Sequence, residues 1–301
     1  MSRQQVSGMA CSAMSLRALL KESEARLKTS GIDQPGLEAA WIVEHVLGLS
    51  PLTQRIQAER GMIVTQCEQV RGLIARRAAR EPLQYLLGTQ EFCGRDFQVT
   101  PSVLIPRPES ALLVDEAVRR CAQVQAPTVV DVGTGSGCLA VSLALALPMA
   151  RVLAIDVSAD ALVVARANIA RYGLEARIAC FHGNLLAPIA EQGLAHQVDV
   201  MLSNPPYIAD EDIAALQPEV RDFEPRLALA GGCDGMGVHR RLLEQAPAYL
   251  KPGGVLLMEV GIGQAGAVCR EAEKQGRFHL SAVLQDQGGI DRVVCFENKA
   301  A

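Results

Sequence analysis

The fold is decided by the stretch TVVDVGTGSGCLAVSLALA, residues 128–146, in which three closely spaced glycines separate two apolar runs. The valines of the first run predict a strand, and the alanines and leucines of the second predict a helix. Gly133, Gly135 and Gly137 predict a turn where the backbone approaches a ligand closely, because glycine has no Cβ. The helix that follows offers free N–H groups at the same place.

Strands and helices alternate through the rest of the chain. Apolar strands are expected at 128–132, 151–155, 178–181, 198–203, 254–260 and 292–296, with helical segments such as 159–172 between them. This order predicts an α/β fold with a doubly wound, Rossmann-like parallel sheet and helices on both faces. Helical spacing predicts a smaller all-helical N-terminal domain at 1–89, and the alternation in EFCGRDFQV predicts a β-hairpin linker at 90–108. The catalytic domain is expected at 109–301.

The composition is that of an ordinary globular protein. The 301 residues are 49% hydrophobic and 21% charged, which excludes a wholly disordered chain. Residues 1–90 hold 11 basic and 8 acidic side chains, and residues 91–301 hold 18 and 25, giving balances of +3 and −7. A balance of −7 repels phosphate, so direct nucleic-acid binding is not expected.

The cysteines and histidines do not follow the spacing of metal ligands, so no metal site is expected. Scattered cysteines predict free thiols in a reducing compartment. Since the start lacks a sustained apolar segment and no apolar run is long enough to span a bilayer, we expect a cytoplasmic protein without membrane contact. The cysteines are Cys11, Cys67, Cys93, Cys121, Cys138, Cys180, Cys233, Cys269 and Cys295.

The glycine turn and the acid after it predict a nucleoside-containing cofactor. Asp156 follows Gly137 by 19 residues, at the end of the next strand, where a carboxylate accepts hydrogen bonds from both ribose hydroxyls. The spacing is G-x-G-x-G, whereas a pyrophosphate is bound by G-x-G-x-x-G. Asp131 before the turn adds negative charge, which favours the cationic S-adenosyl-L-methionine. A tight turn that binds nothing is the alternative.

A second motif, Asn204-Pro205-Pro206-Tyr207, follows the apolar strand VDVMLS. Open α/β sheets place their chemistry at such carboxyl strand ends. Asn204 and Pro205 each offer a carbonyl acceptor, Pro206 fixes the preceding residue in an extended conformation, and Tyr207 offers a flat face. These groups suit a planar NH₂ group held beside an activated methyl carbon. A Pro-Pro turn that only ends the strand is the alternative.

Together, the glycine turn, Asp156 and NPPY resemble S-adenosylmethionine-dependent methyltransferases that act on a planar nitrogen. Four further segments resemble the peptide chain release factor glutamine methyltransferases in particular: REPLQYLLG (80–88), EFCGRDFQV (91–99), VLIPRPES (103–110) and EVRDFEPRLAL (219–229). The resemblance covers about residues 16 to 296. It implies transfer of a methyl group to the glutamine amide of the Gly-Gly-Gln motif in peptide chain release factors.

The resemblance also implies roles for individual residues. Asn204, Pro205, Pro206 and Tyr207 would bind the glutamine amide, and of these Asn204, Pro205 and Tyr207 would be catalytic. The cofactor would be held by Gly133, Thr134, Gly135, Ser136, Gly137, Asp156, Asn184, Leu185 and Asn204. Two positions depart from the family pattern, because Asn184 stands where aspartate is usual and Ser110 where threonine is usual. The N-terminal helices would recognise the substrate, and the protein is expected to be a monomer.

Three alternatives remain open. Ribosomal-protein glutamine methyltransferases share NPPY but lack the IPRPE form of the linker. An adenine-specific nucleic-acid methyltransferase would need a basic face and salt-sensitive binding, against which the −7 balance argues. A catalytically inactive adaptor that binds release factors is the third. The loop at 210–237, which carries mixed charges, is expected to dock the protein substrate; a lid and an ordinary solvated loop are the alternatives.

Overall fold

The computed structural model describes residues 14–190 and 192–299, so Cys11 lies outside the described residues. The chain divides into two compact units, one ending at Leu87 and one beginning at Gly88. Each unit has its own hydrophobic core. No helix within the described ranges is long and apolar enough to cross a membrane.

The first unit consists of the helices α1 (Leu16–Thr29), α2 (Pro35–Leu47), α3 (Pro51–Ile56), α4 (Val64–Ala78) and α5 (Leu83–Leu87). Ser15 caps α1 by accepting a hydrogen bond from the Ala18 N–H, and Gly48 ends α2 in a left-handed conformation that costs glycine little. A partly buried ion pair links two of the helices, with Arg77 Nε 2.5 Å from Glu38 Oε2. The predicted all-helical N-terminal part is thus confirmed, although the short helices α3 and α5 were not foreseen.

The second unit contains a hairpin and a large sheet. The strands are β1 (Thr89–Phe92), β2 (Arg95–Gln98), β3 (Thr128–Val132), β4 (Arg151–Asp156), β5 (Ile178–His182), β6 (Val198–Ser203), β7 (Leu250–Glu259), β8 (Phe278–Gln285) and β9 (Asp291–Asn298). The helices are α6 (Ala111–Cys121), α7 (Cys138–Ala146), α8 (Ala159–Arg171), α9 (Pro218–Phe223), α10 (Gly237–Gln245) and α11 (Ala265–Gln275).

The sheet order is β5-β4-β3-β6-β7-β9-β8. Strands β3 to β7 run parallel, whereas β9 runs antiparallel to both β7 and β8. The predicted doubly wound, Rossmann-like fold is confirmed, and the sequence missed only β8 and the antiparallel edge. Strands β3, β4 and β5 are added toward one edge of the sheet, and β6 and β7 toward the other. The loops that follow β3 and β6 therefore diverge to opposite faces of the sheet and border one crevice.

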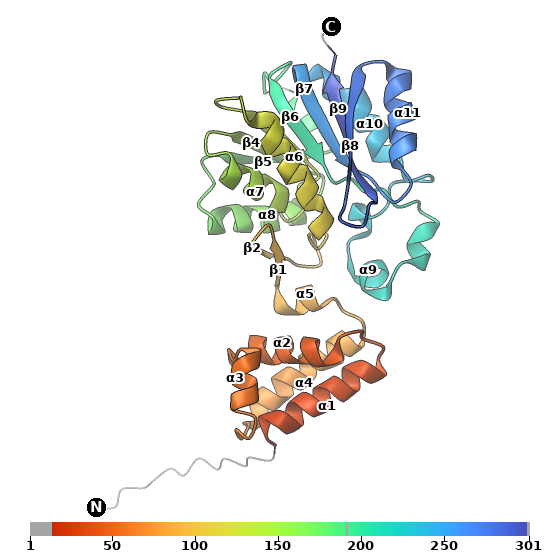
Figure 1. Ribbon diagram of the computed structural model, residues 1–301. Coiled ribbons are helices and arrows are strands. Elements are labelled where there is room, and N and C mark those ends of the chain that lie inside the picture. Colours follow the sequence, from red (N-terminus) through yellow and green to blue (C-terminus); the bar gives the residue numbers. More distant parts are fainter. Residues whose placement is uncertain (1–13, 191, 300–301) are drawn as a thin grey trace, which may run out of the picture. The chain divides into compact units, whose positions relative to one another are not determined.

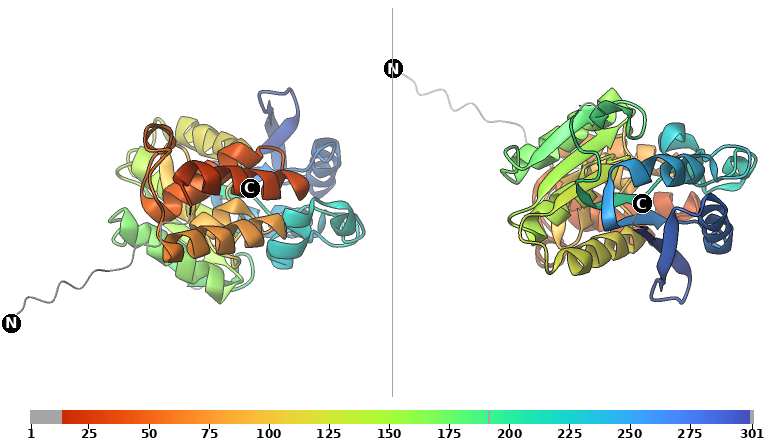
Figure 2. Two further views of the ribbon diagram at one scale, coloured as in Figure 1. Left: turned by 90° about the horizontal axis from the view of Figure 1, so that it is seen from below. Right: turned by 90° about the horizontal axis from the view of Figure 1, so that it is seen from above.

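Helices cover both faces of the sheet, with α6, α7 and α8 on one face and α10 and α11 on the other (Figures 1 and 2). Neighbouring residues of a strand point to opposite faces, and the core follows that rule. Val129 packs with α6 and α7, whereas Val130 packs with α10 and α11. Because the central strands are buried on both faces, they are predominantly apolar, and this is why the sequence revealed them.

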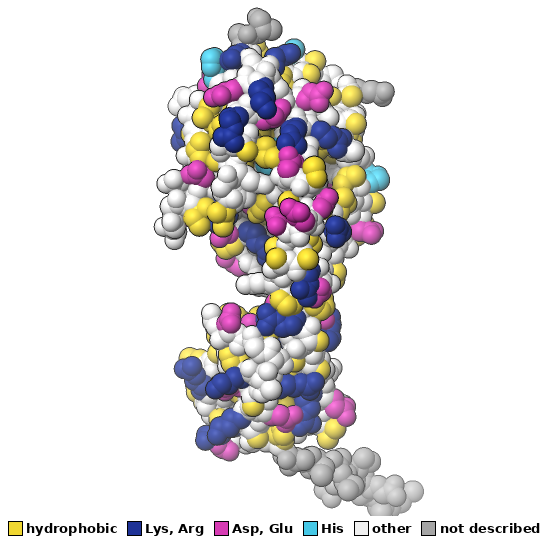
Figure 3. Space-filling model, turned by 90° about the vertical axis from the view of Figure 1, so that its right-hand side faces the viewer, with side chains coloured by type: hydrophobic (Ala, Val, Ile, Leu, Met, Phe, Trp, Pro, Cys, Tyr) yellow, Lys and Arg dark blue, Asp and Glu magenta, His cyan; other side chains and the backbone are white. Residues whose placement is uncertain are grey.

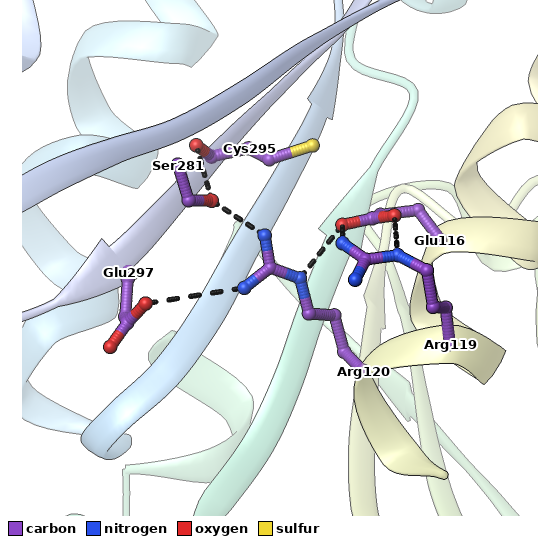
Figure 4. Close-up of polar contacts among 6 residues, drawn as sticks. All are labelled: Glu116, Arg119, Arg120, Ser281, Cys295 and Glu297. Carbon is purple, nitrogen blue, oxygen red and sulfur yellow. Dashed lines mark hydrogen bonds and ion pairs between the residues drawn. The ribbon is translucent and has the colours of Figure 1, made fainter.

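Helix α6 is fastened to the antiparallel edge by a polar network (Figure 4). Buried Glu116 accepts hydrogen bonds from Arg119 and Arg120. Arg120 Nη2 also donates to Ser281 Oγ of β8 at 2.7 Å, and Ser281 Oγ donates to the Cys295 carbonyl of β9 at 3.1 Å. The network satisfies a buried carboxylate and fixes α6, whose N-terminal end begins beside the crevice.

The hairpin β1–β2 packs into the core of the second unit. Phe92 and Phe97 are 2% and 0% exposed and belong to the same cluster as α6 and α7. The Asn168 side chain of α8 accepts from the Gln98 N–H at 2.7 Å and donates to the Ser136 carbonyl at 2.8 Å. One buried amide therefore joins the hairpin to the glycine turn. The expected role of residues 90–108 as a linker stays a prediction.

Candidate active site

A pocket of about 300 Å³ lies at the carboxyl ends of β3, β4 and β6, where the order of the strands reverses. The structure brings most of the predicted site residues together around it. Those that line it are Gly133, Thr134, Gly135, Ser136, Asp156, Asn184, Leu185, Asn204, Pro205 and Pro206. Gly137 and Tyr207 are not among the lining residues.

The glycine turn is held against β4. The N–H groups of Gly133 and Thr134 both donate to the Ile155 carbonyl, at 2.8 and 2.9 Å. Gly135 has φ +55° and open space where a Cβ would stand, so its backbone faces the pocket directly. Gly137 serves packing instead, because a Cβ there would lie 3.3 Å from the backbone of Ala165.

The Asp156 side chain closes the turn. Its Oδ2 accepts the Gly135 N–H at 2.8 Å and its Oδ1 accepts the Ser158 N–H at 2.9 Å. Burial raises the pKa of this carboxyl, while the N–H donors of Ser158 and Gly135 oppose that shift. A carboxylate has about four lone-pair sites, so about two remain for a ligand. Two free acceptor sites suit the two hydroxyls of a ribose.

Asp131 lies beneath the turn rather than in the pocket wall. It is fully buried, and its Oδ2 accepts a hydrogen bond from Thr134 Oγ1 at 2.6 Å. Burial raises the pKa of Asp131 to about 7. At neutral pH it therefore carries less negative charge than the sequence argument assumed, and the glycine spacing is the stronger argument against a pyrophosphate.

Asn184 and Leu185 form the third side of the cofactor region, after β5. Leu185 is 9% exposed and has φ +50°, a conformation that leucine rarely adopts. Asn184 Oδ1 accepts a hydrogen bond from Arg241 Nη2 at 3.1 Å. Since its oxygen is engaged, the Asn184 NH₂ group is the end that remains to donate to a ring nitrogen of a ligand.

The NPPY turn begins where β6 ends. Ser203 Oγ donates to the Val132 carbonyl at 2.6 Å and ties the ends of β6 and β3 together. Asn204 Nδ2 donates to Ser110 Oγ at 3.0 Å, which leaves its carbonyl oxygen available. Pro205 is buried and lines the pocket. Both acceptors named from the sequence thus lie at the crevice.

The Tyr207 side chain is placed beside β7. Its hydroxyl donates to Glu259 Oε1 at 3.5 Å, and its backbone carbonyl accepts from Gln264 Nε2 at 2.8 Å. Burial raises the pKa of Tyr207 to about 12, so the phenol stays neutral. The predicted stacking of Tyr207 on the substrate amide stays a prediction.

Sequence reasoning missed the residues that support the NPPY turn. A Cβ at Gly231 would lie 2.8 Å from the Pro206 carbonyl, and one at Gly235 would meet the Tyr207 carbonyl even more closely. Glu259, at the carboxyl end of β7, is 2% exposed and binds Ser110. An acid that directly follows the apolar run GGVLLM is the signal that would have identified Glu259.

The loop at 210–237 is partly structural. Glu224 is 6% exposed, and its Oε1 lies 2.6 Å from Arg107 Nη2. Burial raises the pKa of Glu224, and Arg107 opposes that shift. The pair holds this loop against the segment that precedes α6, so Glu224 is unavailable for docking. Arg221 pairs with the neighbouring Asp222 at the surface.

Two family models match the chain: the PrmC N-terminal domain at residues 18–88 and the methyltransferase small domain at residues 109–220. A release factor glutamine methyltransferase of Geobacter sulfurreducens is 45% identical over 93% of this chain and 95% of its own. One of Moorella thermoacetica is 41% identical over 94% and 98%.

Among solved structures, the catalytic domain of hMettl16, in complex with the MAT2A 3'UTR hairpin 6, is 18% identical, with a TM-score of 0.56 over 74% of this chain and 81% of that one. This likeness concerns the fold alone. The relatives, by contrast, match over nearly the full length of this chain, and the crevice contains most of the predicted cofactor-binding and substrate-binding residues. The chain therefore belongs to the release factor glutamine methyltransferase family.

Proposed function

We propose that this protein transfers a methyl group from S-adenosyl-L-methionine to the side-chain amide nitrogen of the glutamine in the Gly-Gly-Gln motif of peptide chain release factors. The observation that carries the proposal is the Asn204 side chain, which stands at the crevice with its NH₂ committed to Ser110 and its carbonyl oxygen available. The names of the full-length relatives support the same substrate.

The residues present fit the cofactor. Gly135 offers an open backbone surface, and Asp156 keeps lone pairs for ribose hydroxyls. Leu185 and the Asn184 amide line the same pocket and would hold the adenine. When bound, S-adenosyl-L-methionine supplies an activated methyl group. The Asp131 carboxyl beneath the turn keeps Thr134, and with it the shape of the turn, in place.

The NPPY turn orients the acceptor. The lone pair of an amide nitrogen is delocalised, so this nitrogen is a weak nucleophile. Hydrogen bonds from its two protons to Asn204 Oδ1 and the Pro205 carbonyl hold the NH₂ group in place and increase the electron density on nitrogen. The lining of the pocket is largely apolar, which favours a reaction that disperses charge.

We also propose that the protein acts as a monomer in the cytoplasm, that it does not bind nucleic acid directly, and that the helical unit recognises the protein substrate. The −7 balance of residues 91–301 supports the second of these statements. On the face shown in Figure 3, basic and acidic side chains are interspersed rather than gathered by sign. Size-exclusion chromatography with light scattering tests the first statement.

Methyl transfer from radiolabelled cofactor tests the proposed function. Purified release factor should be labelled, and the same factor with glutamate in place of the Gly-Gly-Gln glutamine should not. Ribosomal proteins, DNA and RNA serve as parallel acceptors. Labelling of nucleic acid or of a ribosomal protein in place of release factor would refute the proposal, and binding of release factor without labelling would indicate an adaptor.

A further inference from the structure

Three side chains from separate elements form a hydrogen-bonded line behind the pocket, which we call the relay. Asn204 Nδ2 donates to Ser110 Oγ at 3.0 Å, and Ser110 Oγ donates to Glu259 Oε2 at 2.5 Å. Ser110 and Glu259 are 3% and 2% exposed. The parallel register of β6 and β7 brings Asn204 beside Glu259, because the residues before them, Ser203 and Met258, are direct partners.

The chemistry of the three groups fixes the direction of the relay. A carboxylate only accepts hydrogen bonds, and a serine hydroxyl has a single proton. Ser110 must therefore give its proton to ionised Glu259 and accept from Asn204. Only the NH₂ end of the Asn204 amide donates, so the carbonyl end is directed away from Ser110.

We propose that Ser110 and Glu259 are positioning residues that hold the Asn204 amide with its carbonyl oxygen toward the substrate amide. The inference rests on the methyl-transfer function proposed above. The NH₂ group of a glutamine needs an acceptor. If the Asn204 side-chain amide were flipped, its NH₂ group would face the NH₂ group of the substrate glutamine, and the hydrogen bond between them would be lost. The relay excludes this orientation.

Protonation of Glu259 removes the constraint, because a protonated carboxyl can donate to Ser110 and reverse the relay. Burial raises the pKa of Glu259 to about 7. The Ser110 hydroxyl, the positive charge of Arg292 and the Tyr207 hydroxyl oppose this shift, whereas the negative charge of Glu109 adds to it. The His239 Nε2 is hydrogen-bonded to the Glu259 backbone carbonyl, and burial lowers the pKa of His239. Since the relay needs the carboxylate, it is intact above about pH 7 and is lost as the pH falls through that value.

The pH profile of kcat tests the inference. In the wild type, kcat should fall about tenfold per pH unit below the Glu259 pKa. Glu259→Gln keeps an acceptor for Ser110 and can donate to Tyr207, but it does not titrate. Its kcat should therefore be flat from pH 6 to 8. Glu116→Gln, a buried glutamate in the α6 network, is the matched control and should keep the wild-type acid limb.

Ser110 provides the second test. Ser110→Ala should lower kcat about 10²-fold at pH 8, the scale expected when an acceptor is misoriented. Ser110→Thr keeps the hydroxyl and should restore most of the loss. If Glu259→Gln does not fold, Ser110→Ala should also show no acid limb. An acid limb retained in a folded Glu259→Gln variant, or an unchanged kcat in Ser110→Ala, overturns the inference.

A readout that does not need turnover separates this inference from the proposed function. The side-chain NH₂ protons of Asn204, assigned in ¹H–¹⁵N spectra by their loss in Asn204→Ala, should shift with a midpoint near the Glu259 pKa in the wild type. They should not shift in Glu259→Gln. If release factor is not methylated but this titration is present, the function fails while the relay stands. If methylation is present and the shift is absent, the relay is refuted.

Discussion

Replacement of Asp156 by asparagine removes one acceptor from the cofactor region while it preserves the size of the side chain. In the wild type, each carboxylate oxygen accepts one backbone N–H, from Gly135 at 2.8 Å and from Ser158 at 2.9 Å, and keeps one lone pair for a ribose hydroxyl. In Asp156→Asn one oxygen becomes an NH₂ group. One backbone N–H then faces another donor, and one ribose hydroxyl loses its charged acceptor.

The expected magnitude follows from this count. A hydrogen bond to a charged group contributes about 1.5–3 kcal/mol. The Kd of S-adenosyl-L-methionine should therefore rise about 10- to 200-fold, as measured by isothermal titration calorimetry. Asp160→Asn is the matched control, because Asp160 is exposed in the first turn of α8 and the charge change is the same.

The control should bind with wild-type affinity. A Kd for Asp156→Asn within about twofold of the wild type, less than about 0.5 kcal/mol, would refute the ribose assignment.

Three further changes test other parts of the site. Gly231→Ala places a Cβ 2.7 Å from the Gly235 carbonyl oxygen and 2.8 Å from the Pro206 carbonyl oxygen, so the backbone that packs on the NPPY turn must shift and kcat should fall about 10²-fold. Gly266→Ala on α11 meets only a flexible side chain and should remain active; equal activities would contradict the packing argument. Asn204→Ala should lower kcat about 10²- to 10³-fold in the labelling assay, and full turnover would exclude the predicted role. Asn168→Ala removes buried hydrogen bonds and should cost about 2–4 kcal/mol in urea unfolding, and an unchanged midpoint would show that the hairpin is held otherwise.

The central part of the fold was predictable because its strands are buried on both faces. An apolar run such as VDVMLS has to be covered by helices, and its bounds, Val198–Ser203, agree with the prediction. Strand β8 was missed because most of its side chains are exposed. His279 and Leu280 are both exposed in it, so it shows neither a continuous apolar run nor a clean alternation.

The binding residues were predictable where the chain itself keeps them close to a strand end. The glycine turn and the NPPY turn each directly follow an apolar strand, so their meeting at the crevice needed only the order of the strands. Glu259 and Ser110 were not identified as partners of Asn204, because their contact depends on the register of β6 and β7 and on where α6 begins. The strand register is not visible in local sequence patterns.

The burial of charged side chains also could not be predicted from the sequence. Asp131 was taken as a negative charge near the cofactor, but burial raises its pKa to about 7. Glu224 was placed on a docking loop, but it is buried against Arg107. In both cases the deciding quantity is the desolvation of the carboxylate, which depends on residues far away in the chain.

A crystal structure of this protein with S-adenosylhomocysteine and a peptide that contains Gly-Gly-Gln tests the account most directly. The account predicts the glutamine NH₂ group at about 3 Å from both Asn204 Oδ1 and the Pro205 carbonyl, with its nitrogen facing the thioether sulfur. A glutamine nitrogen bound outside this turn, or an Asn204 amide that presents its NH₂ group to the peptide, would contradict it.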